Sequence, residues 1–240
     1  KGLVYPNGPY YNSSTIQRGS LLTTDFTGDP STPFEPALPL DGKEKIERID
    51  PKNAQLHSIP VSPIGYGEAE KILSQMNGDP VPQSWQGGLP FTYRLQGGSS
   101  LTVRLKVDQK IDFVRATNVI GMLKGTDAPD EWIILGCHLD SWGFGATDPS
   151  SGTAMLLSLS QTLGKLKDEG YSPKRSILIG HWDAEEHGVI GSTEWVEQMR
   201  EELNAKGVIY MNFDGAVSGK GFGVSSAPTL KKLLVEASKD

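Results

Sequence analysis

In the second half of the chain, apolar residues occur in two alternating patterns, one typical of strands and one typical of helices. From about residue 113 onward, short apolar stretches typical of buried strands alternate with longer stretches of helical period. Such an alternation indicates βαβ units, in which a mixed, mostly parallel sheet carries helices on both faces, so the sequence predicts an α/β fold. The predicted strands are 116–123, 132–137, 176–180 and 207–212, and the predicted helices are 152–167, 191–205 and 229–238.

The first part of the chain is rich in proline, and 12 of the 16 prolines lie within the first 100 residues. This composition predicts loops and extended segments in place of regular layers. Residues 64–76 are predicted to form one helix, and residues 101–107 alternate between apolar and polar positions as a strand does.

Composition narrows the class of protein. With 23 Lys and Arg against 29 Asp and Glu, the 240-residue chain has a net charge of −6, which argues against a nucleic-acid partner. No run approaches the roughly 18 apolar residues of a membrane span, and no targeting segment is recognisable. The single cysteine, Cys137, excludes an internal disulfide and is expected to be a core residue, not a nucleophile. With four histidines in the chain, a metal site would depend on carboxylates.

Acidic and histidine residues follow three of the predicted strands at the point where each strand ends. Because the carboxyl ends of parallel strands meet at one edge of a sheet, these side chains are expected to converge. His138 and Asp140 are two residues apart, so on an extended backbone Asp140 can accept the second ring N–H of His138 and fix its tautomer. The alternative for His138 and Asp140 is an ordinary pair on the protein surface. Asp148 precedes a proline, and its alternative is an ordinary Asp-Pro turn.

Glu185 and Glu186 are adjacent carboxylates after a buried strand, and such a pair repels unless a cation lies near it. Consecutive side chains diverge, so one can bind a metal while the other acts as general base in metal-assisted hydrolysis. The alternative is a pair of solvated acids at a helix N-terminus. Together with His138, Asp148 and Asp214, Glu186 completes a set of one imidazole and three carboxylates that suits a two-metal site.

Long ordered motifs in this region resemble a known family. The stretch 138–152 (HLDSWGFGATDPSSG), the stretch 182–195 (WDAEEHGVIGSTEW) and Asn212-Phe-Asp214 are similar to the co-catalytic zinc peptidases of the glutamate carboxypeptidase II and transferrin receptor type. The resemblance extends over nearly the whole chain, including residues 58–66 and 118–121.

The resemblance implies a dizinc exopeptidase in which a zinc-bridging hydroxide attacks the peptide bond. Asp148 would bridge two Zn²⁺ ions, His138 and Asp214 would bind one of them, and Glu186 would bind the other. Glu185 would be the catalytic general base, and Asp140 would assist through His138. The family has a further histidine ligand from a later loop, and no histidine follows Asp214.

The resemblance also suggests how the chain is organised. Residues 1–112 would be the C-terminal part of a protease-associated (apical) domain. Residues 113–240 would be the N-terminal part of the zinc peptidase domain, which would continue beyond the chain. The expected location is extracellular, periplasmic or a membrane-anchored ectodomain, and any homodimer would form through regions outside this chain. The expected substrate is a peptide or an N-acyl amino acid.

A calcium ion is implied as well. Glu194 and Glu197 lie one helical turn apart, and in the family such acids join a Gly-Asp-Pro-x-Thr-Pro loop to bind Ca²⁺ through oxygen ligands. Residues 28–33 match that loop and supply Thr32, whereas Glu35 stands where the family often has tyrosine. A solvated acidic helix face is the alternative.

Three functional classes stay open at this point. A carboxypeptidase, including a glutamate carboxypeptidase, and an aminopeptidase of the same fold both fit the motifs. A noncatalytic receptor-like relative is the competing class. The presence of all five candidate site residues argues against it; they are His138, Asp148, Glu185, Glu186 and Asp214. Hydrolysis of a non-peptide amide is the third.

Overall fold

The computed structural model describes residues 12–217 and 219–239 and divides the chain into two compact units. One unit comprises residues 117–183 and 199–240, and it holds the sheet. The other comprises residues 1–116 and 184–198. No helix among the described residues is long and apolar enough to cross a membrane.

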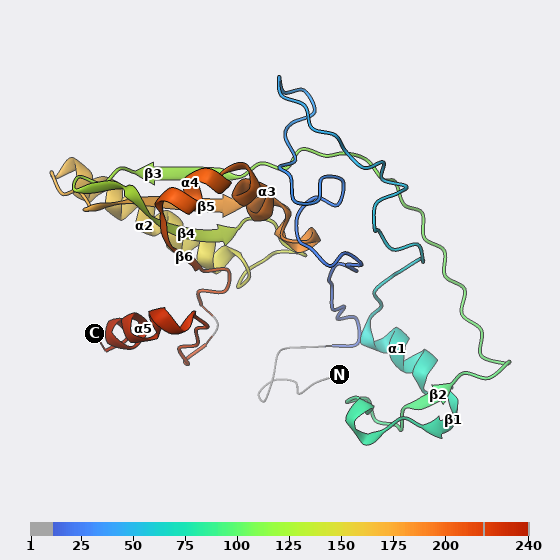
Figure 1. Cartoon of the computed structure of the whole chain (residues 1–240). Coiled ribbons are helices and arrows are strands. Elements are labelled where there is room, and N and C mark those ends of the chain that lie inside the picture. Colours follow the sequence, from blue (N-terminus) through green and yellow to red (C-terminus); the bar gives the residue numbers. More distant parts are fainter. Residues whose placement is uncertain (1–11, 218, 240) are drawn as a thin grey trace. The chain divides into compact units, whose positions relative to one another are not determined.

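The first of these units, which we call the sheet unit, is built on four strands that lie side by side in the order β3-β5-β4-β6 (Figure 1). β4 runs parallel to both β5 and β6, and β3 is antiparallel to β5. The predicted mixed, mostly parallel sheet is therefore confirmed. The strands are β3 (Val119–Leu123), β4 (Ala128–His138), β5 (Arg175–Trp182) and β6 (Gly207–Asn212).

Helix α2 (Ser150–Asp168) covers one face of the sheet through an apolar core. Leu156 of α2 is fully buried against Leu135, Cys137 and Ile179 of the strands. These strand residues are two apart within a strand or aligned between strands, so they share one face. The buried thiol confirms that Cys137 is a core residue.

Helix α4 (Arg200–Lys206) contacts β4 and β6, and the ammonium of Lys206 lies 5.1 Å from the ring centroid of Trp132. Trp132 is an odd number of residues from Leu135 and Cys137, which places it on the opposite face of β4 from α2. The chain ends with η3 (Pro228–Leu230) and α5 (Lys231–Ala237), where one helix over 229–238 was predicted.

Two more sequence predictions need correction. The single helix predicted over 191–205 is two helices, α3 (Ile190–Gln198) and α4, because Met199 between them departs from helical geometry with φ −99° and ψ 17°. The strand predicted over 101–107 is wrong: among the described residues this segment pairs with no strand and runs as extended chain (Figure 1). An alternating pattern makes a strand only where a neighbour supplies the backbone hydrogen bonds.

The other unit, which we call the loop unit, contains little regular structure, as its proline content predicts. Helix α1 (Tyr66–Leu73) is shorter than expected because Gly65 before it is extended, with φ −69° and ψ 163°. The other elements of this unit are β1 (Asn77–Pro80), η1 (Gln83–Trp85), β2 (Arg94–Gln96), η2 (Glu185–His187) and α3.

Replacing Gly152 with alanine is expected to destabilise the protein by about 3 kcal/mol or more. A Cβ at Gly152 in α2 would lie 1.6 Å from the carbonyl oxygen of Phe213 and 3.0 Å from the Sγ atom of Cys137, so the helix must move away from the strand. Gly164→Ala in the same helix is the control, since its Cβ meets nothing within 4 Å, and it should stabilise by about 1 kcal/mol. Denaturant unfolding measures both; equal effects would contradict the steric argument.

Candidate metal centre

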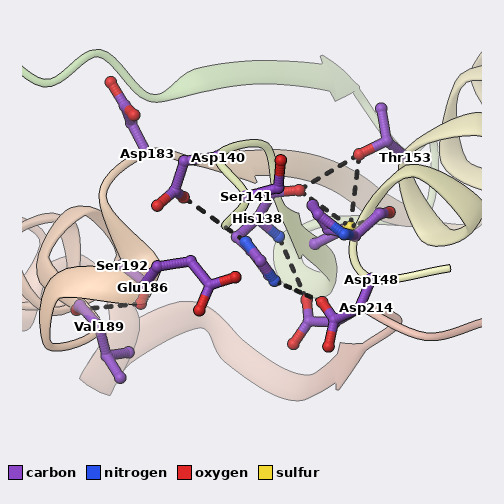
Figure 2. A network of polar contacts seen from close by, with 12 residues as sticks. His138, Asp140, Ser141, Asp148, Thr153, Asp183, Glu186, Val189, Ser192 and Asp214 are labelled. Atoms are coloured by element: carbon purple, nitrogen blue, oxygen red, sulfur yellow. Dashed lines mark hydrogen bonds and ion pairs between the residues drawn. The ribbon is translucent and has the colours of Figure 1, made fainter. Parts of the chain in front are cut away.

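His138 is the last residue of β4, and its imidazole is enclosed between two carboxylates (Figure 2). The Nε2 atom lies 2.8 Å from Oδ1 of Asp148, and Nδ1 lies 3.5 Å from Oδ1 of Asp140. The side chain of His138 is only 3% exposed, whereas that of Asp148 is 65% exposed. One ring nitrogen therefore faces a solvent-accessible acid, while Asp140 lies on the side where a tautomer-fixing group was predicted.

Asp214 meets the same histidine from the end of the neighbouring strand β6. Its Oδ1 accepts the backbone N–H of His138 at 3.2 Å, and its Oδ2 accepts the side-chain N–H of Asn212 at 2.5 Å. The backbone N–H of Phe213 donates to the carbonyl of Gly136 at 2.9 Å and continues the pairing of the two strands. The sheet thus brings His138, Asp148 and Asp214 together, as the strand-end argument predicts.

The loop between His138 and Asp148 is closed by short-range contacts. Gly145 has φ +59°, and a Cβ there would lie 2.7 Å from that of Ser141 and 3.2 Å from the carbonyl oxygen of Asp148. The carbonyl of Gly145 accepts the N–H of Ser150 at 2.8 Å. Glycine is therefore needed at the point where the loop turns back to present Asp148.

The electrostatic potential around His138 is negative, because several acids surround it. Burial raises the pKa of the Cys137 thiol, and the charges of Asp214 and Asp148 raise it further. A thiol held in its neutral form in the core is a poor nucleophile. The acids beside His138, in contrast, form a local negative potential that favours a cation.

The donor chemistry fits zinc. One imidazole nitrogen and two aspartate carboxylates are the nitrogen and oxygen ligands that Zn²⁺ accepts, and Nε2 of His138 already faces a carboxylate oxygen. The carboxylate of Asp140 lies 3.5 Å from Nδ1, on the side where a zinc-binding histidine typically has an orienting acid.

Glu185 and Glu186 belong to the loop unit, where they open the short helix η2. The backbone is held in left-handed conformations on both sides of them, with φ 55° at Ala184 and φ 57° at Val189. Such conformations cost roughly 1–3 kcal/mol each and cluster at functional sites. The carbonyl of Glu186 accepts the hydroxyl of Ser20 at 2.6 Å, so contacts within the unit support the strained turn.

Sequence reasoning missed a clamp at the end of β5. Oδ2 of Asp183 accepts the backbone N–H of Thr117 at 2.7 Å, and the N–H of Asp183 donates to Oδ1 of Asn118 at 3.0 Å. This clamp ties the end of β5 to the start of β3, one residue before Ala184 and two before Glu185. The signal was present, because Asn118 and Asp183 both lie within the stretches that carry the family resemblance.

The predicted calcium ligands lie within the loop unit, and the structure brings Glu194 against the 28–37 loop. Its two carboxylate oxygens accept the backbone N–H groups of Asp29 and Ala37, each at 2.5 Å. The hydroxyl of Thr32 is buried and has no hydrogen-bond partner among the described residues. Burial raises the pKa of Glu194, so the charged acid is destabilised where it stands. Glu35 is exposed, and Glu197 is half-buried one turn from Glu194.

Tyr210 of β6 is expected to titrate abnormally. Burial of its hydroxyl raises the pKa of Tyr210 to about 12 against about 10 for an ordinary tyrosine. Ionisation therefore favours the unfolded chain, and the stabilising contribution of Tyr210 is present below pH 10 and lost between pH 10 and 12. Unfolding free energies measured across that window should fall more steeply for the wild type than for Tyr210→Phe. Parallel curves would contradict the raised pKa.

Comparison with known proteins places the sheet unit within a peptidase family. Residues 118–238 match the profile of peptidase family M28. Aminopeptidase NAALADL1 of Rattus norvegicus is 37% identical over all of this chain and 33% of its own length. The probable glutamate carboxypeptidase VP8 of Zea mays is 39% identical over 93% of this chain and 31% of its length. The glutamate carboxypeptidase 2 homolog of Caenorhabditis briggsae is 37% identical over 98% of this chain and 31% of its own length.

Among solved structures, the peptidase M28 precursor of Shewanella amazonensis SB2B is 28% identical and covers 51% of this chain and 27% of its own, with a TM-score of 0.38. The chain spans about a third of the length of the curated relatives it matches. Its match to the family profile runs from the start of β3 to the last helix and includes every residue of the sheet that carries a site side chain. The chain therefore belongs to peptidase family M28.

Proposed function

We propose that the protein is a zinc-dependent exopeptidase that hydrolyses peptide bonds with two Zn²⁺ ions. The observation that carries the proposal is the enclosed imidazole of His138, with Asp148 at Nε2 and Asp214 on its backbone N–H, inside the segment that matches the M28 profile. His138, Asp148, Asp214 and Glu186 would hold the ions, with Asp148 between them.

Bound zinc would supply a Lewis acid that polarises the peptide carbonyl and makes water acidic enough to react near neutral pH. The residues of the chain do the remaining work. Asp140, whose Oδ1 lies 3.5 Å from Nδ1 of His138, would orient the imidazole so that Nε2 points toward the metal. Glu185 takes a proton from the attacking water and returns it to the leaving amine. The left-handed Ala184 turns the backbone before Glu185 and Glu186, which lets adjacent carboxylates serve different roles.

An exopeptidase removes residues from either the amino or the carboxyl terminus of its substrate, and relatives of this chain are named for both activities. The rat relative is named an aminopeptidase and the maize relative a glutamate carboxypeptidase. The two activities differ in which terminus of the substrate must be free. We propose the carboxypeptidase first, since two of the three relatives compared above carry that name.

The test uses two dipeptides in parallel, one with an acetylated N-terminus and one with an amidated C-terminus. Hydrolysis of the acetylated dipeptide alone, lost with a zinc chelator and restored by zinc, supports a carboxypeptidase. Hydrolysis of the amidated dipeptide alone identifies an aminopeptidase. A protein that binds two zinc ions and cleaves neither dipeptide would contradict the proposal and favour the receptor-like class.

We also propose that Ca²⁺ binds in the loop unit through Thr32, Glu194 and Glu197, with Glu35 as a weaker candidate. The support is the half-buried carboxyl of Glu194, which burial shifts to a raised pKa and which binds the backbone of the loop that carries the Thr32 hydroxyl, buried without a hydrogen-bond partner among the described residues. Carboxylate and hydroxyl oxygens are suitable ligands for Ca²⁺, and a cation would offset the cost of burying Glu194 in its charged form.

Calcium is therefore expected to raise the thermal midpoint of the protein. At a concentration 100 times its dissociation constant, it should stabilise by about 2.7 kcal/mol. Glu197→Gln should remove most of the increase, whereas Glu201→Gln on the exposed surface of α4 should leave it unchanged. Differential scanning calorimetry with and without a calcium chelator measures the effect. An increase that persists in Glu197→Gln would place the ion elsewhere.

A further inference from the structure

A chain of side-chain hydrogen bonds runs across the sheet unit and ends on Asp214. Nε1 of Trp182 donates to the hydroxyl of Tyr210 at 3.0 Å, and that hydroxyl donates to Oδ1 of Asn212 at 2.6 Å. The amide of Asn212 then donates to Oδ2 of Asp214 at 2.5 Å. The four residues come from the end of β5, from β6 and from the loop after β6.

The chemistry of these groups sets the direction of the chain. An indole N–H can only donate, so the Tyr210 oxygen must accept from Trp182 and point its own hydrogen elsewhere. Asn212 then accepts at its oxygen, which leaves the amide nitrogen to donate. An ionised carboxylate can only accept, so Asp214 is the natural end of the series. Each member therefore has one role, and the chain ends on an acceptor oxygen of Asp214.

The neighbouring strands leave room for this chain. A Cβ at Gly136 of β4 would lie 2.3 Å from the Tyr210 hydroxyl oxygen and 2.5 Å from Nε1 of Trp182. A Cβ at Gly180 would lie 2.5 Å from the ring of Trp182. Only glycine at these two positions allows the indole and the phenol to meet over the sheet.

Asp214 is held from both sides as a result. Its Oδ1 is fixed by the backbone N–H of His138, and its Oδ2 is fixed by Asn212. Two donors on different oxygens prevent the carboxylate from rotating, while each oxygen keeps a second lone pair for a metal. Groups that hold a metal ligand in this way typically change metal affinity 10–100-fold when they are removed.

We infer that Tyr210 and Asn212 are positioning residues that orient Asp214 for zinc, so that the hydrogen-bond chain from Trp182 determines how tightly zinc is held. This inference rests on the proposed function, because it takes Asp214 as a zinc ligand. Neither residue is itself one of the proposed zinc ligands. Their effect passes through the carboxylate of Asp214 alone.

Zinc binding by the apo-protein tests the inference without relying on activity. Competition with a fluorescent zinc chelator should show that Tyr210→Phe weakens zinc binding about 10-fold and that Asn212→Ala weakens it 10–100-fold. Tyr171→Phe is the matched control, because Tyr171 is 65% exposed and far along the chain from the site. The thermal midpoint of each apo-protein separates positioning from folding, since a structural role would lower the midpoint with unchanged zinc affinity.

The outcomes distinguish this inference from the proposed function. If the wild type binds zinc and Tyr210→Phe and Asn212→Ala bind it equally tightly, the positioning roles are wrong and the proposed function stands. If the wild type binds no zinc, both are wrong. Weaker binding in both variants, with Tyr171→Phe unchanged, supports the inference.

Discussion

Glu185→Gln is expected to lower kcat by a factor of about 10²–10⁴ while leaving the zinc of the proposed site bound. Glutamine has nearly the shape of glutamate but cannot take a proton from water at neutral pH. The loss should appear in kcat and kcat/KM together, because general-base assistance operates in the transition state and not in substrate binding. Steady-state kinetics and zinc analysis on the same preparation measure the two quantities.

Two further measurements define the role of Glu185. Glu201→Gln, an exposed acid of α4, is the matched control and should keep full activity. Loss of zinc from Glu185→Gln would move this residue into the ligand set and would leave the role of base to another group. The neighbouring Glu186→Gln should behave in the opposite way, with reduced zinc content as its first effect.

The strand-end residues show what the sequence could predict. β6 has the predicted bounds, and the convergence of His138, Asp148 and Asp214 follows from parallel strands that end at one edge. These features depend on periodicity and on the order of residues along the chain. Both properties are visible in a linear sequence.

Other features depend on partners far away in sequence. The segment 101–107 alternates as a strand does, yet alternation does not supply a neighbour to pair with. The link from Trp182 to Tyr210 joins residues 28 positions apart on strands that β4 separates, and two glycines make it feasible. The left-handed Val189 contradicts the preference of a β-branched residue, so propensity could not have found it. Such strain persists only where the surrounding contacts outweigh it.

Asp148 should have the largest influence on the metal content, because the proposed bridging role engages both ions. Its side chain is 65% exposed and its carboxylate contacts Nε2 of the buried His138, so it contributes charge to the site without contributing to the core. Asparagine keeps a hydrogen-bonding group against His138 at this exposed position, so we expect the substitution to change the free energy of unfolding by no more than about 0.5 kcal/mol. An effect on zinc can therefore be separated from an effect on folding.

Asp148→Asn is expected to release both zinc ions and to abolish hydrolysis, while the apo-protein keeps its thermal midpoint. Asparagine retains a hydrogen bond to His138 but removes the negative charge that a bridging ligand supplies to two cations. Inductively coupled plasma mass spectrometry of dialysed protein measures the zinc, with Asp130→Asn, an aspartate 83% exposed, as the matched control. Retention of one ion would show that Asp148 binds a single metal, and retention of both would show that it binds neither. Either result would replace the bridging assignment, because a carboxylate shared by two ions cannot be neutralised without weakening both.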